Sequence, residues 1–271
     1  MKKFSYPIMV GVGIIFLAYA KTLYWMVGSW VMNPYYSHGV LVAAVSAYIT
    51  YKTLPKIKFN PEKGNKLGIL IFSSAMVIHA ISYVYSYYWI SALSFPFALF
   101  GCLYFLDEEL AKALAFPVFF VLLAIPYPIY GIANRLEIFS ALAASRILNL
   151  MGIKTTLAGA EIATAKNAFV VGAPCSGIRS MLALATVSVL YSYLVRVKLV
   201  IKAILLVISI PLAMLANVLR IVSVIVSAEY FGLKFSMSYV HPISDLVFFA
   251  LAVISLIGIE KLLRKVSGCG S

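Results

Sequence analysis

Charged residues are scarce in this chain, and acidic ones most of all. Of its 271 residues, 11% are charged and only nine are Asp or Glu, whereas 63% are hydrophobic. A soluble domain usually carries about 25% charged and roughly 45–50% apolar residues. So few charges could not cover a water-facing surface, which excludes an ordinary soluble protein. The mean hydropathy of +1.00 predicts that the chain lies largely in lipid.

Cysteine is also scarce, with three residues that do not make a disulfide framework. Cys102 lies inside an apolar run and is expected to be a small core residue. Cys269 belongs to the stretch 267–271, which is predicted to be a flexible tail. Two further signals are missing: His, Asp and Glu at metal-ligand spacing, and a Gly-rich phosphate loop. We therefore expect no metal and no cofactor.

Long apolar runs dominate what remains. A membrane span needs about 20 apolar residues, and the chain is predicted to be an all-α integral membrane protein with about eight spans. It is expected to form a single polytopic membrane domain over 1–271. The predicted spans are residues 6–31, 38–54, 67–86, 88–106, 110–130, 174–194, 199–228 and 241–262.

One long connection, 131–173, separates the fifth and sixth predicted spans. From Ile132 to Met151, charged and apolar residues alternate in a way that suits an interfacial helix, and Gly152 ends the pattern. The stretch from Lys154 to Val171 is rich in Thr, Ala and Val and is expected to form a short β-hairpin or an irregular outer lid.

Basic residues set the predicted orientation. The net charge of +13 would suggest nucleic acid in a soluble protein, but here the basic residues sit in short loops between apolar runs. With the N-terminus inside, 14 Lys and Arg fall in inner segments and five in outer ones. This bias predicts a multi-pass protein of the cell membrane, with both termini cytoplasmic and no nucleic-acid partner.

Cys175 stands in a distinctive segment, Ala173 to Ser180, at the predicted start of the sixth span. Pro174 favours the first position of a helix, which would put Cys175 in a first turn where free N–H groups stabilise an anion such as a thiolate. Gly177 allows close approach of a backbone or a substrate, and Arg179 would share a helical face with Cys175. The alternative is that Cys175 is a buried, inert small residue.

Arg220 interrupts an apolar run of about 30 residues. A charge within a span costs roughly 2.5–3.5 kcal/mol on insertion scales and marks a functional candidate. Asn217, three residues earlier, would lie on the same helical face and point into the bundle with it. A guanidinium could stabilise the oxyanion formed when a thiolate attacks a carbonyl. The alternative is that Arg220 extends to the outer interface.

His241 opens the eighth predicted span, and imidazole is the usual base for a cysteine nucleophile. Asp245 follows one turn later and could orient the ring or pair with an Arg; a capping role for His241 is the alternative. The topology brings Cys175, Arg220, His241 and His38 to similar depths on the outer side. The first three supply a nucleophile, an oxyanion stabiliser and a base, the minimum for acyl transfer. His79, in mid-span, is interpreted as a core histidine.

Three stretches resemble the exosortase/archaeosortase family of membrane-embedded cysteine transpeptidases. They are Asn33–Leu41, Pro174–Ser180, and Pro211–Arg220 followed by His241. The resemblance implies Cys175 as nucleophile, Arg220 as oxyanion or substrate stabiliser and His241 as general base or acid. His241, rather than the second Arg of some archaeal members, favours the exosortase-like form. Arg179, His38, Asn217 and Ser176 are expected to support the site or bind substrate.

The resemblance also implies what such an enzyme acts on. Its partners would be secreted protein precursors that end in a short motif, a transmembrane helix and a basic cluster. Cys175 would cleave at the motif on the outer face, hold the product as a thioester and pass it to a lipid or surface-polymer acceptor. The alternatives are an intramembrane cysteine protease with water as acceptor, a multi-pass transporter, and a scaffold with a vestigial site.

Overall fold

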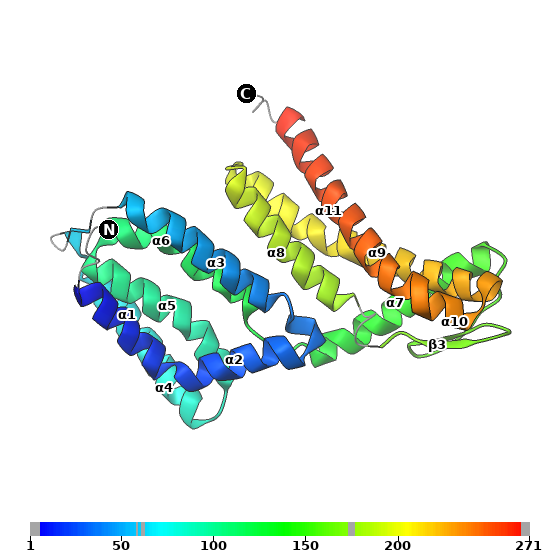
Figure 1. Cartoon of the computed structure of the whole chain (residues 1–271), viewed down its shortest axis with the longest axis horizontal. Coiled ribbons are helices and arrows are strands. Elements are labelled where there is room, and N and C mark those ends of the chain that lie inside the picture. Colours follow the sequence, from blue (N-terminus) through cyan, green and yellow to red (C-terminus); the bar gives the residue numbers. More distant parts are fainter. Residues whose placement is uncertain (1–5, 58, 61–62, 173–176, 267–271) are drawn as a thin grey trace. The chain divides into compact units, whose positions relative to one another are not determined.

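A computed structural model describes residues 6–57, 59–60, 63–172 and 177–266 (Figure 1). The chain divides into two compact units, Met1–Pro128 and Ile129–Ser271, each taken here by itself. Both units are mostly helical. The single membrane domain expected from the sequence stays a prediction, and the tail 267–271 lies outside the described residues.

The first unit is built from helices only, within its described residues. They are α1 (Tyr6–Ala18), α2 (Ala20–Met32), η1 (Pro34–Tyr36), α3 (Gly39–Thr53), η2 (Leu54–Lys56), α4 (Leu67–Val84), α5 (Tyr88–Leu106), α6 (Glu108–Phe120) and η4 (Val121–Ala124).

The second unit combines long helices with a small sheet. Its elements are α7 (Tyr130–Leu150), β1 (Thr156–Ala158), β2 (Glu161–Ala163), β3 (Ala168–Val170), α8 (Ile178–Leu194), α9 (Leu199–Phe231), α10 (Leu233–Phe235), the π-helix η6 (Ser236–Val240) and α11 (His241–Val266).

Helices long and apolar enough to cross a membrane make this a multi-pass membrane protein. Among the described residues they number four: α4, α5, α9 and the run from α10 to α11. The bent pair of α1 and α2 adds a fifth if it counts as one span. Each predicted span overlaps at least one helix, but α3, α6 and α8 have only 15, 13 and 17 residues. The number eight therefore stays a prediction.

The first predicted span, 6–31, is not straight: α1 and α2 meet at an angle of 67° at Tyr19. The ring of His79, on α4, hydrogen bonds to the backbone of Ala18 at the break and through Nδ1 to Ser91 Oγ at 2.8 Å. Tyr19 stacks on that ring at 3.8 Å and reaches Ser94 Oγ at 2.8 Å. Side chains thus satisfy the polar groups that a broken helix exposes in an apolar medium. The interpretation of His79 as a core histidine is confirmed.

A second set of side chains caps the chain where η4 ends and the helical hydrogen bonding stops. They come from α2, η1 and the start of α3, the stretch that carries the first part of the resemblance. The bonds are Trp30 Nε1 to the Ala124 carbonyl at 2.7 Å, His38 Nε2 to the Leu123 carbonyl at 2.9 Å, and the Tyr36 hydroxyl to the Tyr127 carbonyl. In this unit, His38 therefore serves as a cap for a helix end.

Two glycines let α4 and α5 pack backbone to backbone. A Cβ on Gly68 would lie 2.3 Å from the amide nitrogen of Phe105, and a Cβ on Gly101 would lie 2.6 Å from that of Phe72. Small residues at such crossings are the usual way in which membrane helices gain close contact. Cys102, next to Gly101, is half-buried and packs against the cluster around Tyr19 rather than lying in its centre.

The connection 131–173 folds as a helix and a sheet. The predicted helix from Ile132 to Met151 corresponds to α7, while the stretch expected as a hairpin or irregular lid forms a three-stranded antiparallel sheet in the order β1-β2-β3. Gly159 takes a φ of +62° in the first turn, a value that favours glycine. Ile162 of β2 is fully buried with Leu148 of α7 and Ile225 of α9. A role as a lid stays a prediction.

We predict that Gly101→Ala lowers the thermal unfolding midpoint in detergent, because the new methyl group would collide with the backbone of α4. Overpacking of this kind costs about 1–3 kcal/mol. Gly13→Ala on α1 is the matched control, since a Cβ there meets nothing within 4 Å. Equal midpoints for the two variants would contradict the close packing of α4 on α5.

Candidate functional site

Arg220 is the buried cation of the second unit. It lies on α9, eleven residues before the helix ends at Phe231, and its residue surface is 5% exposed. The sequence alternative, in which Arg220 extends to the outer interface, does not hold because the side chain is enclosed by protein. Asn217, one turn earlier, is also buried and donates through Nδ2 to Ser140 Oγ of α7 at 3.4 Å. The two residues point into the bundle together, as predicted.

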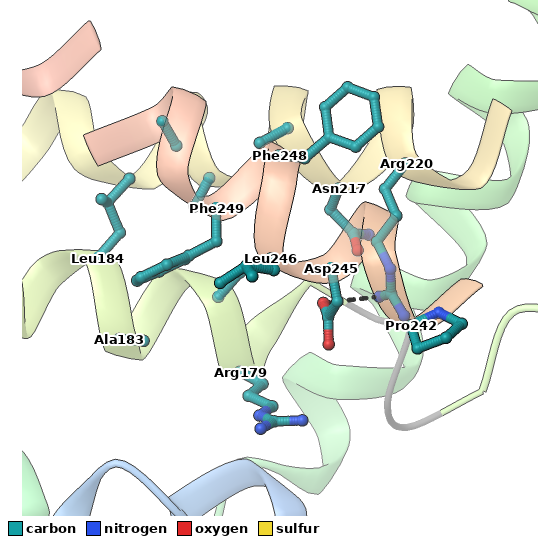
Figure 2. Close-up of a pocket in the computed structure, with 14 residues that line it drawn as sticks. Arg179, Ala183, Leu184, Asn217, Arg220, Pro242, Asp245, Leu246, Phe248 and Phe249 are labelled. Atoms are coloured by element: carbon teal, nitrogen blue, oxygen red, sulfur yellow. Dashed lines mark ion pairs between the residues drawn. The ribbon is translucent and has the colours of Figure 1, made fainter. Parts of the chain in front are cut away.

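Two residues of α11 contact the Arg220 guanidinium. Nη2 lies 3.3 Å from His241 Nε2. Nη1 lies 3.4 Å from Asp245 Oδ1, the ion pair drawn in Figure 2. Because a guanidinium has only donors, Nε2 is the acceptor in this contact and the proton of a neutral ring is on Nδ1. Of the two roles considered for Asp245, the structure selects pairing with an Arg. Helix geometry puts His241 and Asp245 on one face of α11, because they are one turn apart, and the packing of α9 against α11 brings Arg220 to them.

The π-helix η6 directly precedes His241 and places it beside Arg220. Pro242 follows His241 inside a run that is helical from Leu233 to Val266. A proline in a helix interior removes one hydrogen bond and collides with the carbonyl four residues earlier, and a π-turn is a local adjustment that accommodates it. Ser236 of η6 ties this turn to α9 through bonds of 2.6 Å to Ser227 Oγ and to the Val224 carbonyl.

Gly177 marks the start of α8 and touches the same face of α9. Its φ is +82°, and a Cβ at this position would lie 3.1 Å from Asn217 Nδ2. The left-handed backbone makes Gly177 the N-cap, so α8 begins at Ile178. The predicted helix start at Pro174 is therefore wrong. The argument that put Arg179 one helical turn from Cys175 fails with it, because the helix begins between them.

A cleft of about 340 Å³ opens between α8, α9 and α11 beside the Arg220–Asp245 pair (Figure 2). Its polar lining residues are Arg179, Ser180, Asn217, Arg220 and Asp245, and the others are apolar. The apolar lining consists of Ala183, Leu184, Ala213, Ala216, Pro242, Leu246, Phe248, Phe249 and Ala252. The cleft could accept a polar group such as a carbonyl together with hydrocarbon.

The remaining predicted site residues fall in different places. Arg179 is exposed and lines the cleft. His38 belongs to the first unit. Cys175 and Ser176 lie outside the described residues. Sequence reasoning did not include Ser140, the hydrogen-bond partner of Asn217, because a serine in an amphipathic helix carries no signal of its own. Among the described residues, no group of three His, Cys, Asp or Glu could hold a metal ion.

Residues 30–258 match the family of transmembrane exosortases, described as Exosortase_EpsH. The chain belongs to the transmembrane exosortase family. The match spans α2 to α11 and so includes Cys175, Arg220 and His241. The resemblance found in the sequence is thereby confirmed. Members of this family are generally membrane cysteine transpeptidases that act on secreted precursors with a C-terminal sorting signal. No curated protein and no solved structure matches the chain.

We predict that Gly177→Ala destabilises this unit, because alanine at a φ of +82° is strained and its methyl group would press on Asn217. A left-handed conformation costs a non-glycine residue roughly 1–2 kcal/mol. Thermal unfolding in detergent measures the loss. Gly172→Ala is the control, since a Cβ there meets nothing within 4 Å; a midpoint lowered equally by both changes would contradict the assignment.

Proposed function

We propose that this exosortase-family protein is a cysteine transpeptidase that cleaves a C-terminal sorting signal and transfers the product to an acceptor. The observation that carries the proposal is the buried Arg220 guanidinium, in contact with His241 at 3.3 Å. A cation and an imidazole held together beside a cleft supply two of the three groups that acyl transfer needs. Cys175 supplies the third, on the strength of its motif and the family.

The proposed reaction has two steps. The Cys175 sulfur attacks the carbonyl carbon of the scissile peptide bond, and His241 takes the thiol proton. The C–N bond then breaks, His241 gives that proton to the leaving amine, and a thioester remains. In the second step a hydroxyl or amine of the acceptor attacks the thioester carbonyl and loses its proton to His241. The thiolate leaves and regains that proton, which restores the enzyme.

Arg220 has a defined part in this scheme. The guanidinium donates to His241 Nε2 in the structure described here. A substrate carbonyl entering the cleft would compete for the same donor. Once Arg220 turns to the carbonyl oxygen, Nε2 is free to accept a proton and the guanidinium stabilises the oxyanion. Asp245 keeps the guanidinium in place while this exchange occurs, since Nη1 stays paired at 3.4 Å.

Four further residues are proposed to support the site. Asn217 braces the start of α8, which begins within the motif Pro174–Ser180, through its contact with Gly177. Arg179, exposed at the cleft, could bind a polar group of the substrate. Ser176 is included because of its place in the motif, and His38 through the first stretch of the resemblance.

The membrane arrangement is part of the same proposal. The chain is a single domain with about eight spans and both termini in the cytoplasm, and the site faces outward. The connection 131–173 covers it as an interfacial helix and lid. α9 supports this arrangement: its 33 residues extend about 50 Å, well beyond a hydrocarbon core of about 30 Å. Arg220 lies 21 residues after Leu199, at a depth suited to the far interface.

The substrates are proposed to be secreted precursors with a short motif, a transmembrane helix and a basic end. The acceptor is a lipid or a surface polymer. Water as acceptor would make the protein an intramembrane protease instead, and a transporter would use Arg220 and His241 to line a pathway. The experiment below distinguishes these three.

We predict that Cys175→Ala abolishes processing of a tagged precursor from the same genome that carries a C-terminal transmembrane helix and a basic cluster. Loss of the nucleophile removes the thioester, so the precursor should accumulate at full length on immunoblots. Cys102→Ala is the control and should process normally, because Cys102 is half-buried in α5 of the first unit.

The chemical nature of the product distinguishes a transpeptidase from a protease, and an uptake assay identifies a transporter. Mass spectrometry of the new C-terminus shows an added group for transfer and a free carboxylate for hydrolysis. Continued processing by Cys175→Ala would contradict the nucleophile assignment. Solute uptake abolished by Arg220→Ala, with Cys175→Ala unaffected, would identify a transporter.

We also predict that Asp245→Asn slows processing roughly two- to fivefold, the size expected for a half-exposed ion pair. The variant keeps the shape of the side chain but removes the charge that orients Arg220, whereas Asp245→Glu should restore most of the rate. Glu229→Gln, which breaks another ion pair on α9 with Lys166, serves as the control. Identical rates for Asp245→Asn and the unmodified protein would contradict an orienting role.

A further inference from the structure

The sheet of the second unit has an open edge at β3. The strand order β1-β2-β3 leaves β3 paired on one side only. Its residues, Ala168, Phe169 and Val170, include no proline and no charge, the devices that usually protect an exposed edge. The opposite edge, β1, is different because Thr155, just before it, hydrogen bonds to Asn149 of α7 at 3.0 and 2.8 Å.

The register shows which backbone groups face outward. Val171 N donates to the Ala160 carbonyl at 2.9 Å, and Thr164 N donates to the Asn167 carbonyl at 2.8 Å. Hydrogen-bonded pairs alternate along an antiparallel ladder, so Asn167, Phe169 and Val171 face β2. Ala168 and Val170 consequently direct their N–H and C=O groups away from β2, and no hydrogen bond joins those groups to another described residue.

The strand also runs toward the candidate site. The turn before β3 is fixed to the C-terminal part of α9, where Lys166 bonds to the Glu229 carbonyl at 2.9 Å. After β3, Val171 joins the buried cluster with Val218 and Ile221, and Gly177 touches Asn217. Four strand residues span about 13 Å, and the nine helical residues between Glu229 and Arg220 span about 13 Å as well. β3 thus lies along α9 and leads from Glu229 to Arg220.

We propose that the open edge of β3 binds an extended segment of the precursor by β-augmentation and directs it to the Arg220–His241 pair. The inference rests on the proposed function. Unpaired N–H and C=O groups at a strand edge are complementary to one kind of ligand, a polypeptide backbone in the extended conformation. The bound segment is the stretch of the precursor that precedes its transmembrane helix. Since Val170 is 71% exposed and Ala168 is small, the contact relies on backbone atoms and tolerates varied side chains.

Val170→Pro tests the contact, because proline removes the outward N–H but leaves the pairing with β2 intact. The rate of processing of the tagged precursor should fall roughly three- to tenfold, the effect of one backbone hydrogen bond. Val170→Ala keeps the N–H, so its rate should exceed that of Val170→Pro. Leu157→Pro is the matched control on β1, where the register also turns the N–H of Leu157 away from β2. Equal rates for Val170→Pro and Leu157→Pro would overturn the proposal.

A cross-linking measurement covers the case in which Val170→Pro fails to fold. A photoreactive phenylalanine derivative replaces Val170, or Leu157 as control, in a Cys175→Ala background that holds the uncleaved precursor. Cross-linking to the precursor from position 170, and not from 157, supports the proposal. Cross-linking only to a second copy of the chain, or none at position 170, overturns it. Failure of the proposed function gives a different result, namely full processing by Cys175→Ala itself.

Discussion

The second unit is organised around a guanidinium that apolar surroundings would otherwise reject. Burying a charge in a lipid-facing helix is costly unless other groups neutralise and hydrogen bond it. Arg220 meets this condition through α11, which offers His241 at 3.3 Å and Asp245 at 3.4 Å. Much else follows from holding α11 against α9 at this level, including the π-turn before Pro242, the serine contacts at Ser227 and Ser236, and the cleft between α8, α9 and α11.

The local pattern of apolar and polar residues predicts much of the fold and part of the candidate site. The apolar runs predicted at 67–86 and 88–106 correspond to α4 and α5 within two residues, and 199–228 corresponds to α9. Arg220 and Asn217 stood out because polar residues are rare in such runs. The predictions that failed concern features that depend on contacts between distant parts of the chain or on the conformation of a single residue. No local signal predicts the 67° bend at Tyr19, where the ring of His79, sixty residues away in sequence, stacks on the Tyr19 ring. Likewise, Pro174 signals a helix start that the left-handed Gly177 postpones to Ile178.

The two units hydrogen bond their irregular backbone in different ways. Where α1 gives way to α2, and where η4 ends, side chains from other helices bond to the exposed backbone groups. In the second unit, the stretch after α7 pairs its backbone groups within its own sheet, apart from those on the outer edges. In a chain with so few charges, the side chains of Tyr, Trp, His and Ser therefore provide hydrogen bonds to irregular backbone. Several residues that a motif search would take for reactive groups also serve as caps, and His38 is one.

The short link between α9 and α11 bears on how the protein enters the bilayer. Arg220 and Asp245 are 25 residues apart. Their two helical segments are connected through Gly232, whose φ is positive. Such a helical hairpin can partition into lipid as a pair, so the cation and its counter-ion leave water together. Neither α9 nor α11 then has to cross the insertion machinery as a lone charged helix. The chain order thus provides Arg220 with a neutralising carboxylate on the helix synthesised immediately after its own.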